Sequence, residues 1–381
     1  MTTMVKPHSW ADIDRQALLH NLARVRELAP GKRVCTVIKA NAYGHGVHAL
    51  AETLMPRLGD KDLAAVATLS EALALSETLT THPILILRGP LDAEEMDLIL
   101  HKGFHWTLHS VRQADLLKHW LSQNSGKLPA LNIWLKLNTG MNRLGLYTSD
   151  LQQIWHWLQS LYAPGERVLM SHFATADETG HALAQTQQLN FNQMTASLPG
   201  AQNTARSLSA SAGIIALPRA HHDIVRPGIM LYGVSPMEGH NGADEGLLPV
   251  MSLKSRLLTI NQIKAGETVG YGASYQCPED MPIGVVGIGY GDGYPRHVPS
   301  GTPVLIHAAG KVWQAPLAGR VSMDVLTVDL RGIPAQPGDE VLLWGQAWGN
   351  TLPAETIALQ AGTIAYELFC QITSRVKLFY R

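Results

Sequence analysis

The chain has 381 residues, with 30 Lys and Arg residues against 31 Asp and Glu residues and a formal net charge of −1. This length favours two domains and a large buried core. The balanced charge argues against a nucleic-acid-binding surface and against a charged membrane anchor, and it favours a small-molecule partner.

The cysteines, Cys35, Cys277 and Cys370, are far apart in the sequence and form no CxxC pair. This pattern predicts free thiols in a reducing compartment rather than a disulfide framework. The first residues lack the apolar segment of a secretory signal, and no run approaches the ~18 apolar residues that span a bilayer. We therefore expect a cytoplasmic protein without a nucleic-acid or membrane partner.

The first two thirds of the chain alternate between short apolar runs and amphipathic segments. The apolar runs lack polar alternation, which predicts buried strands. These strands are expected at 34–40, 63–69, 83–89, 104–110, 131–137, 167–174, 206–211 and 222–228. The amphipathic segments predict helices at 15–28, 93–103, 110–124 and 149–162. About eight strand–helix units of this length fit an α/β TIM (β/α)8 barrel, with a doubly wound open sheet as the alternative.

The pattern changes near residue 236, where a segment rich in Gly, Pro and acidic residues begins. Beyond it we expect mostly strands, and one helix at 353–362. The strands are expected at 251–260, 283–290, 302–309, 321–330, 339–345 and 375–380. The sequence thus predicts a barrel domain at 13–240 and a mostly-β domain at 241–381.

Several catalytic and metal-binding motifs are absent from the sequence. There is no HExxH and no Gly-rich phosphate loop that ends in GK[ST]. Ser211 lies in SASAG, which is not a GxSxG nucleophile motif. His221 and His222 are adjacent and would face opposite sides of a strand, so we expect no metal site there.

The most informative segment is VCTVIKANAYGHG, residues 34–46, in which a buried strand ends at Lys39. The carboxyl ends of barrel strands are where catalytic residues gather. A desolvated lysine there has a lowered pKa and attacks carbonyl groups, which suits a Schiff base. A lysine that merely extends to solvent at the end of a strand is the alternative, and the segment alone leaves both open.

The ten residues VIKANAYGHG closely resemble the cofactor-attachment segment of alanine racemases, and the resemblance extends along the chain to Tyr366 in TIAYEL. It implies pyridoxal 5'-phosphate as the cofactor and a TIM barrel followed by a β domain in which residues 1–12 also pack. It further implies a homodimer whose active sites are completed across the subunit interface.

The resemblance also implies a role for each matching residue. Lys39 would carry the cofactor and act as one catalytic base, and Tyr271 of the partner subunit would be the other. Arg143 would contact the substrate carboxylate, as would Met323 of the partner subunit. Lys136 stands at a position often found carbamylated. The remaining cofactor-binding residues would be Tyr43, Ser211, Gly228, Ile229 and Tyr366 at the phosphate, His172 against the pyridine ring and Arg226 at its nitrogen.

These residue types suit racemisation, which removes the Cα proton of an amino acid and returns one to the opposite face. The implied reaction is the interconversion of L-alanine and D-alanine on a substrate–cofactor imine, with two bases that each act alternately as acid. A racemase for serine, lysine or arginine is a close alternative, and Arg296 and Arg320 are candidates to shape its substrate channel.

Two further alternatives resemble the chain less. An amino-acid decarboxylase of the same fold type would carry a run of glycines and an EPGR-like phosphate segment, which this sequence lacks. A non-catalytic pyridoxal-phosphate carrier would resemble the barrel alone, without the β-rich part that contains Tyr271 and Met323.

Overall fold

Within the residues that the computed structural model describes, 7–124, 129–161 and 163–381, eight short parallel strands form one sheet. Their order is β8-β7-β6-β5-β4-β3-β2-β9. An isolated parallel bridge between Ala210 and Arg226 brings the two outer edges together and nearly closes the sheet into a barrel. The strands are β2 (Arg33–Val37), β3 (Leu63–Val66), β4 (Ile84–Ile86), β5 (His105–Leu108), β6 (Ile133–Lys136), β7 (Arg167–Met170), β8 (Ala205–Ser207) and β9 (Ile224–Val225). The TIM-barrel prediction is confirmed, and the open sheet is excluded.

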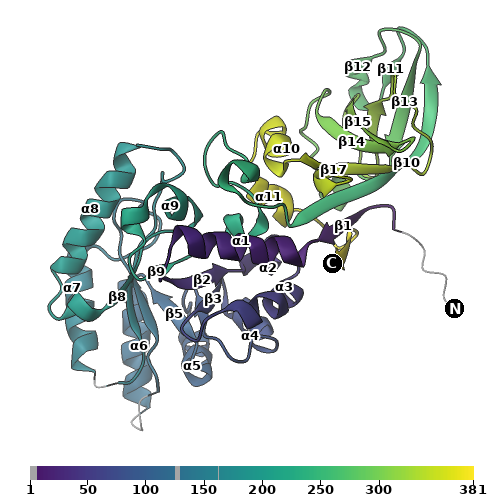
Figure 1. Cartoon of the computed structure of the whole chain (residues 1–381). Helices are drawn as coiled ribbons and strands as arrows, with labels where there is room; N and C mark the ends of the chain where they lie inside the picture. The colour runs from purple at the N-terminus through teal and green to yellow at the C-terminus, as the bar shows by residue number, and fades with distance from the viewer. Residues whose placement is uncertain (1–6, 125–128, 162) are drawn as a thin grey trace.

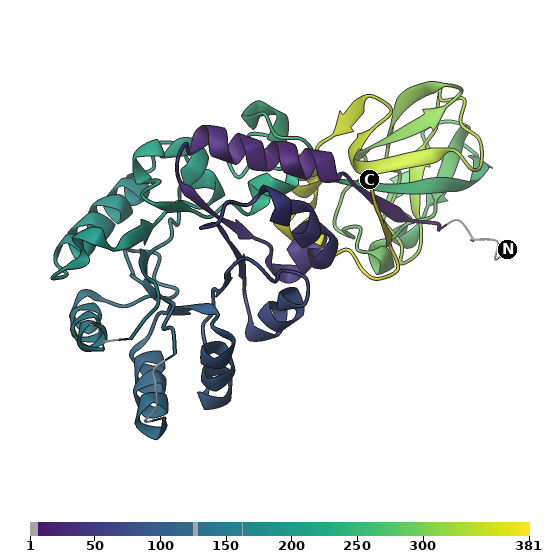
Figure 2. The ribbon, with the colours of Figure 1, turned by 60° about the horizontal axis from the view of Figure 1, so that its bottom comes forward.

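Helices surround the strands of the barrel, as Figure 2 shows. The four helices expected from amphipathic patterns are present as α1, α5, α6 and α7, with ends that differ from the prediction by at most two residues. The helices of this part are α1 (Arg15–Leu28), α3 (Val47–Leu54), α4 (Leu69–Ser76), α5 (Ala93–Lys102), α6 (Val111–Gln123), α7 (Thr148–Ser160), α8 (Ala182–Ala196) and α9 (Ser211–Ala216). Residue 162, the predicted end of α7, lies outside the described residues.

The barrel strands are largely buried on both faces, which explains their mostly apolar sequences without polar alternation. Every residue of β3 and β5 is buried, and the indoles of Trp106 and Trp134 are inaccessible to solvent. Full burial of one aliphatic side chain contributes about 1.5–3 kcal/mol. At the amino end of the barrel, the Nε1 of Trp134 donates to the Nδ1 of His105 over 3.2 Å, so even this polar pair is satisfied internally.

The second part of the structure is mostly β, as predicted, and lies beside the barrel (Figure 1). Its main sheet has the order β15-β14-β17-β10-β1-β19, and β13 and β16 extend it from β10. The predicted strands and the predicted helix are all present. The elements are β10 (Met251–Ile263), β11 (Thr268–Val269), β12 (Tyr275–Gln276), β13 (Met281–Val286), β14 (Pro303–Ala308), β15 (Lys311–Pro316), β16 (Leu326–Asp329), β17 (Glu340–Ala347), β18 (Asn350–Leu352), α10 (Ala354–Ala361), α11 (Ala365–Cys370) and β19 (Lys377–Tyr380).

The two parts are joined at both ends of the chain. β1 (Trp10–Ile13), which precedes the barrel, pairs antiparallel with β10 and parallel with β19. The buried carboxylate of Asp12 pairs with Lys254 at 2.9 Å and with Arg381 at 2.7 Å, which ties the two ends of the chain together. Among the described residues, no helix is both long and apolar enough to cross a membrane.

The short helix α11 brings the second part of the chain to the mouth of the barrel. Its Tyr366 ring lies 5.9 Å from the ring of Tyr43, in the turn that follows β2. The backbone oxygen of Phe369 in the same helix lies so close to Gly44 that a Cβ there would be 2.1 Å away. The mouth of the barrel is therefore built from both parts of the chain.

Candidate active site

The predicted residues of the barrel gather at one edge of the sheet. Lys39 follows β2, Lys136 ends β6, His172 follows β7 and Arg226 follows β9. Because all these strands are parallel, their carboxyl ends face the same side. The structure thus brings together side chains that are far apart in the sequence.

Lys39 opens a turn with an unusual backbone. The four residues after it, 40–43, all have positive φ angles of 51–54°, although none of them is glycine. A left-handed conformation costs roughly 1–2 kcal/mol for each such residue, so this turn stores roughly 4–8 kcal/mol. Strain of this size persists only where surrounding contacts enforce it, and it is concentrated at functional sites.

Contacts within the motif and with α11 hold this turn. The N–H of Gly44 donates to the oxygen of Ala40, and the side-chain oxygen of Asn41 accepts the N–H of Val47 at 2.9 Å. Gly46 has a φ of 89°, and a Cβ there would lie 1.9 Å from the Tyr380 hydroxyl. The glycines of YGHG are therefore required both by backbone angle and by close packing.

Arg226 is buried at the centre of this edge, with 4% of its surface exposed. Its guanidinium donates to the backbone oxygen of Ser171 at 2.6 Å, to the hydroxyl of Ser207 at 2.6 Å and to the backbone oxygen of Leu208 at 3.2 Å. Burial lowers the pKa of Arg226 to about 10, which leaves it protonated at neutral pH. The site therefore contains a fixed, buried cation.

His172 lies next to this cation and is neutral. Its Nδ1 is 3.3 Å from an amino nitrogen of Arg226, which can only donate, so Nδ1 is the acceptor. Burial, followed by the charge of Arg226, lowers the pKa of His172 well below its ordinary value. The other ring nitrogen then carries the proton, and an uncharged ring faces the mouth of the barrel.

Two lysines and a further arginine make the mouth strongly positive. Burial and the neighbouring Arg143 lower the pKa of Lys39. Burial, Arg226, Arg143 and Lys39 together lower the pKa of Lys136 to about 8. Both lysines therefore have a larger neutral fraction than an ordinary lysine. The cluster suits an anionic ligand, and its amines suit attack on a carbonyl group.

The residues predicted to bind phosphate form one small region. The hydroxyl of Ser211 accepts the backbone N–H of Gly228 at 2.9 Å and that of Met230 at 3.4 Å. A Cβ on Gly228 would lie 2.8 Å from the Tyr43 hydroxyl. The aromatic contact of Tyr43 with Tyr366 places both rings beside these groups, and Ile229 is fully buried in the same turn.

Tyr271 and Met323 lie outside this cluster. Tyr271 is 69% exposed, in the turn between β11 and β12, and Met323 is 52% exposed, in the loop between β15 and β16. Figure 1 shows the β11–β12 hairpin at the end of the β-rich part that is remote from β2. One chain alone therefore does not bring Tyr271 to Lys39.

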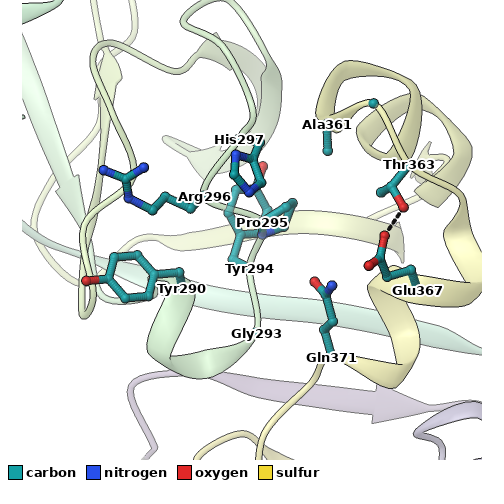
Figure 3. A pocket seen from close by; sticks show the side chains of 11 residues that line it. Tyr290, Gly293, Tyr294, Pro295, Arg296, His297, Ala361, Thr363, Glu367 and Gln371 are labelled. Carbon is teal, nitrogen blue, oxygen red and sulfur yellow. Dashed lines mark hydrogen bonds between the residues drawn. The ribbon is translucent and has the colours of Figure 1, made fainter.

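A pocket of about 390 Å³ lies in the second part of the chain, beside α10 and α11 (Figure 3). The side chains of Arg296 and His297 approach it from one side and Glu367 and Gln371 from the other. None of the predicted cofactor-binding residues lines it. Of the two arginines considered for a substrate channel, Arg296 lines this pocket and Arg320 packs near Gly272 instead.

The sequence-based interpretation missed one residue that contacts the Lys39 turn. Glu71, in α4, accepts the backbone N–H of Ala40 at 2.7 Å. The available signal was the pattern TLSE at 68–71, which is typical of a helix start in which the glutamate side chain turns back. That pattern predicts a local cap and gives no indication of a contact with residue 40.

The whole chain matches one family. The profile described as alanine racemase, N-terminal domain matches residues 13–236, and that of the C-terminal domain matches residues 250–380. An alanine racemase of Pectobacterium atrosepticum is 44% identical over 374 residues, which are 97% of this chain and 98% of that protein. The biosynthetic alanine racemase of Escherichia coli K12 is 44% identical over 372 residues, which are 97% of this chain and 98% of that protein.

Solved structures agree with these matches. The biosynthetic alanine racemase of Pseudomonas aeruginosa superposes with a TM-score of 0.90 at 38% identity, over 99% of this chain and 100% of that chain. An alanine racemase of Bartonella henselae with covalently bound pyridoxal phosphate gives a TM-score of 0.86 at 28% identity, over 99% of this chain and 100% of that chain. The chain therefore belongs to the alanine racemase family, whose members are pyridoxal-phosphate-dependent isomerases.

Proposed function

We propose that Lys39 and Tyr271 of the partner subunit are the two bases with which this alanine racemase interconverts L-alanine and D-alanine. The observation that carries the proposal is the position of Lys39, at the carboxyl end of a barrel strand, with a lowered pKa and beside Lys136, Arg143 and Arg226. A partly neutral lysine among fixed cations is suited to bind a dianionic aldehyde through both its carbonyl and its phosphate.

The residues present fit pyridoxal phosphate. The absence of a Cβ on Gly228 lets the Tyr43 hydroxyl approach the backbone closely, because a Cβ there would lie 2.8 Å from that hydroxyl, and the Gly228 N–H already bonds to the hydroxyl of Ser211. Backbone N–H groups and hydroxyls that gather in this way hold phosphate oxygens. The residues that would hold the phosphate are Ser211, Tyr43, Tyr366 and the backbone N–H groups of Gly228 and Ile229.

When bound, pyridoxal phosphate withdraws electrons from the amino acid and makes its Cα proton acidic enough for a side chain to remove. His172 would pack against the ring, and Arg226 would donate toward the ring nitrogen. Arg226 stays protonated and would not transfer a proton to the ring nitrogen, so it would moderate the electron withdrawal and limit side reactions.

Each base would serve one face of the Cα atom. Lys39 would accept the proton on its side, and Tyr271 would donate one on the other, with the roles reversed in the opposite direction. A tyrosine has an ordinary pKa near ~10, so Tyr271 needs positive neighbours to act as a base. Arg226 and Arg143 at the mouth of the barrel would supply that positive charge, and Arg143, with Met323 of the partner subunit, would hold the substrate carboxylate.

Lys136 would be carbamylated. A carbamate forms only from a neutral amine, and the pKa of Lys136 is lowered to about 8. The product would replace a cation with an anion beside Arg143 and orient its guanidinium by a charge-assisted pair. The test is the intact mass with and without bicarbonate, in which a Lys136→Ala control should not gain CO2. An unchanged wild-type mass contradicts this part.

The proposal implies a homodimer, because Tyr271 lies in the turn of the β11–β12 hairpin, which is remote from β2 and so from Lys39 in a single chain. The unpaired thiols of Cys35, Cys277 and Cys370 favour a cytoplasmic location. We place the domain boundary so that 13–240 form the barrel and 241–381 form the β domain together with the described part of 1–12, since β1 pairs with β10; residues 1–6 lie outside the described residues.

A racemisation assay with a panel of L-amino acids tests the proposal. We expect the highest kcat/KM for alanine, with serine, lysine and arginine as the substrates that would reveal broader specificity. Lys39→Ala should lose the absorbance of the lysine-bound cofactor as well as activity in both directions. Tyr271→Phe should keep that absorbance and lose activity unequally in the two directions. Normal racemisation by either variant would contradict the assignment.

A further inference from the structure

Glu71 contacts the Lys39 turn from a neighbouring strand–helix unit. It is the third residue of α4, and its carboxylate has two separate sets of partners. The Oε2 atom accepts the N–H groups of Ala67 at 2.7 Å and Thr68 at 3.1 Å, which completes a capping box with the Thr68 hydroxyl. An ordinary capping box ends there.

The second oxygen of Glu71 contacts the turn that follows β2, the barrel strand beside β3. Its Oε1 accepts the N–H of Ala40 at 2.7 Å, over a sequence separation of 31 residues. That N–H belongs to the peptide bond between Lys39 and Ala40. The backbone changes there from Ile38, with a φ of −122°, to Ala40, with a φ of 51°. Glu71 therefore holds the peptide at which the left-handed turn begins.

This hydrogen bond lies directly beside Lys39 and affects the backbone that carries its side chain. Ala40 is exposed, and its amide is hydrogen-bonded to Glu71. The direction of the Lys39 side chain depends on the backbone that the bond fixes. Glu71 also acts on the Lys39 ammonium as an opposite charge, among the cations Lys136, Arg143 and Arg226.

We propose that Glu71 is a positioning residue, which holds the Lys39–Ala40 peptide in the left-handed turn and so aims the Lys39 amine at the cofactor carbonyl. The proposal rests on the role of Lys39 proposed above. It concerns a step before catalysis, the attachment of the cofactor to the apoprotein. The carboxylate is suited to this task, since a hydrogen bond to a charged acceptor is short and strong.

The test is Glu71→Gln, with Glu95→Gln as the matched control. Glu95 is the third residue of the next helix, α5, and its carboxylate likewise accepts a backbone N–H near the helix start, from Leu91 at 2.9 Å. Glutamine keeps the size of the side chain but cannot accept hydrogen bonds at both ends. Both variants weaken a helix start. Glu95→Gln also weakens the ion pair of Glu95 with Arg88 at 2.6 Å, whereas Glu71→Gln is the one of the two that disturbs a contact with Ala40.

Two measurements are made on the apoprotein. The first is hydrogen exchange of the Ala40 amide, and the second is the rate at which added pyridoxal phosphate gains the absorbance of the lysine-bound form. We expect Glu71→Gln to accelerate exchange and to slow attachment, each by about tenfold or more, which is the loss expected for one charged hydrogen bond. Glu95→Gln should leave both rates within about twofold.

Attachment at the wild-type rate in Glu71→Gln, or an equal slowing in Glu95→Gln, would overturn the proposal. In case Glu71→Gln does not fold, the wild-type apoprotein decides: an Ala40 amide that exchanges as fast as an open loop shows that the bond is not formed. A Lys39→Ala protein that still binds the cofactor covalently would refute the role of Lys39 instead, so the two failures are distinguishable.

Discussion

The sharing of each active site between two subunits can be tested with mixed dimers. Tyr271 is 69% exposed on a hairpin remote from β2, so we expect it to complete the site of the partner subunit. In a dimer that joins a Lys39→Ala chain to a Tyr271→Phe chain, one site has both substitutions and the other has neither. The intact site should give the mixed dimer about half of the wild-type activity.

The size of the signal follows from the roles of the two residues. Removing a positioned base costs typically ~10²–10⁴-fold in rate, so each parent homodimer should retain about 1% of wild-type activity or less. Recovery to about half is then an increase of roughly fifty-fold over either parent. The chains carry different affinity tags, are co-expressed, and the doubly tagged dimer is assayed for racemisation.

In the matched control, the shared-site arrangement predicts the opposite result. A dimer of a wild-type chain with a Lys39→Ala, Tyr271→Phe double variant has one substitution in each shared site, so it should be nearly inactive. If each site were instead complete within one chain, the wild-type chain would keep half of the activity and the first mixed dimer would have none. That reversed pattern would refute the shared site.

Three further predictions follow from single contacts. Gly228→Ala would place a Cβ 2.8 Å from the Tyr43 hydroxyl, so we expect pyridoxal phosphate to bind more weakly by about 1–3 kcal/mol in equilibrium dialysis. Unchanged affinity would contradict the proposed phosphate site at Gly228 and Tyr43. Arg226→Lys leaves carbonyl oxygens of the buried site without donors, so it should lower the free energy of unfolding of the apoprotein in urea by about 2–4 kcal/mol. A loss below ~1 kcal/mol would show that lysine replaces the hydrogen bonds of the arginine. Burial lowers the pKa values of His45 and His105 from 6.5 to about 4, so the unfolded chain binds protons before the folded chain does as the pH falls. Their contribution to stability is therefore present above pH 6.5, and the free energy of unfolding should fall by about 2 kcal/mol per histidine from pH ~7 to ~5. A free energy of unfolding in urea that does not change over this pH range would refute this.

The barrel strands were predictable because burial on both faces leaves a direct trace in the sequence. β3 is apolar throughout since no position faces water, whereas β5, equally buried, includes the polar residues His105 and Thr107 and has a weaker apolar pattern. The helix α11 was not predicted, because six residues are too few for a clear amphipathic period. Tyr366 could therefore be assigned only through the family resemblance, and its approach to Tyr43 became visible only with the fold.

The conformation at 40–43 could not be predicted from the residues that adopt it. Alanine and tyrosine disfavour positive φ, and in this stretch Asn41 alone tolerates it well. The turn exists because contacts from elsewhere impose it, from Glu71 in α4 and from α11 against Gly44. The same holds for the lowered pKa of His172, which depends first on burial and then on Arg226, a residue that the barrel closure brings beside it.

The mouth of the barrel concentrates features that oppose the stability of the isolated chain. The left-handed turn at 40–43 stores strain, and beside burial the charge of Arg143 lowers the pKa of Lys39, while those of Arg226, Arg143 and Lys39 lower the pKa of Lys136. Local departures from stability rules are expected where function requires them. An anionic ligand attached at Lys39 would offset both the strain and the repulsion. If Lys39 has the role proposed above, the strain would aim its amine, and bound phosphate and carboxylate would offset the repulsion among the cations.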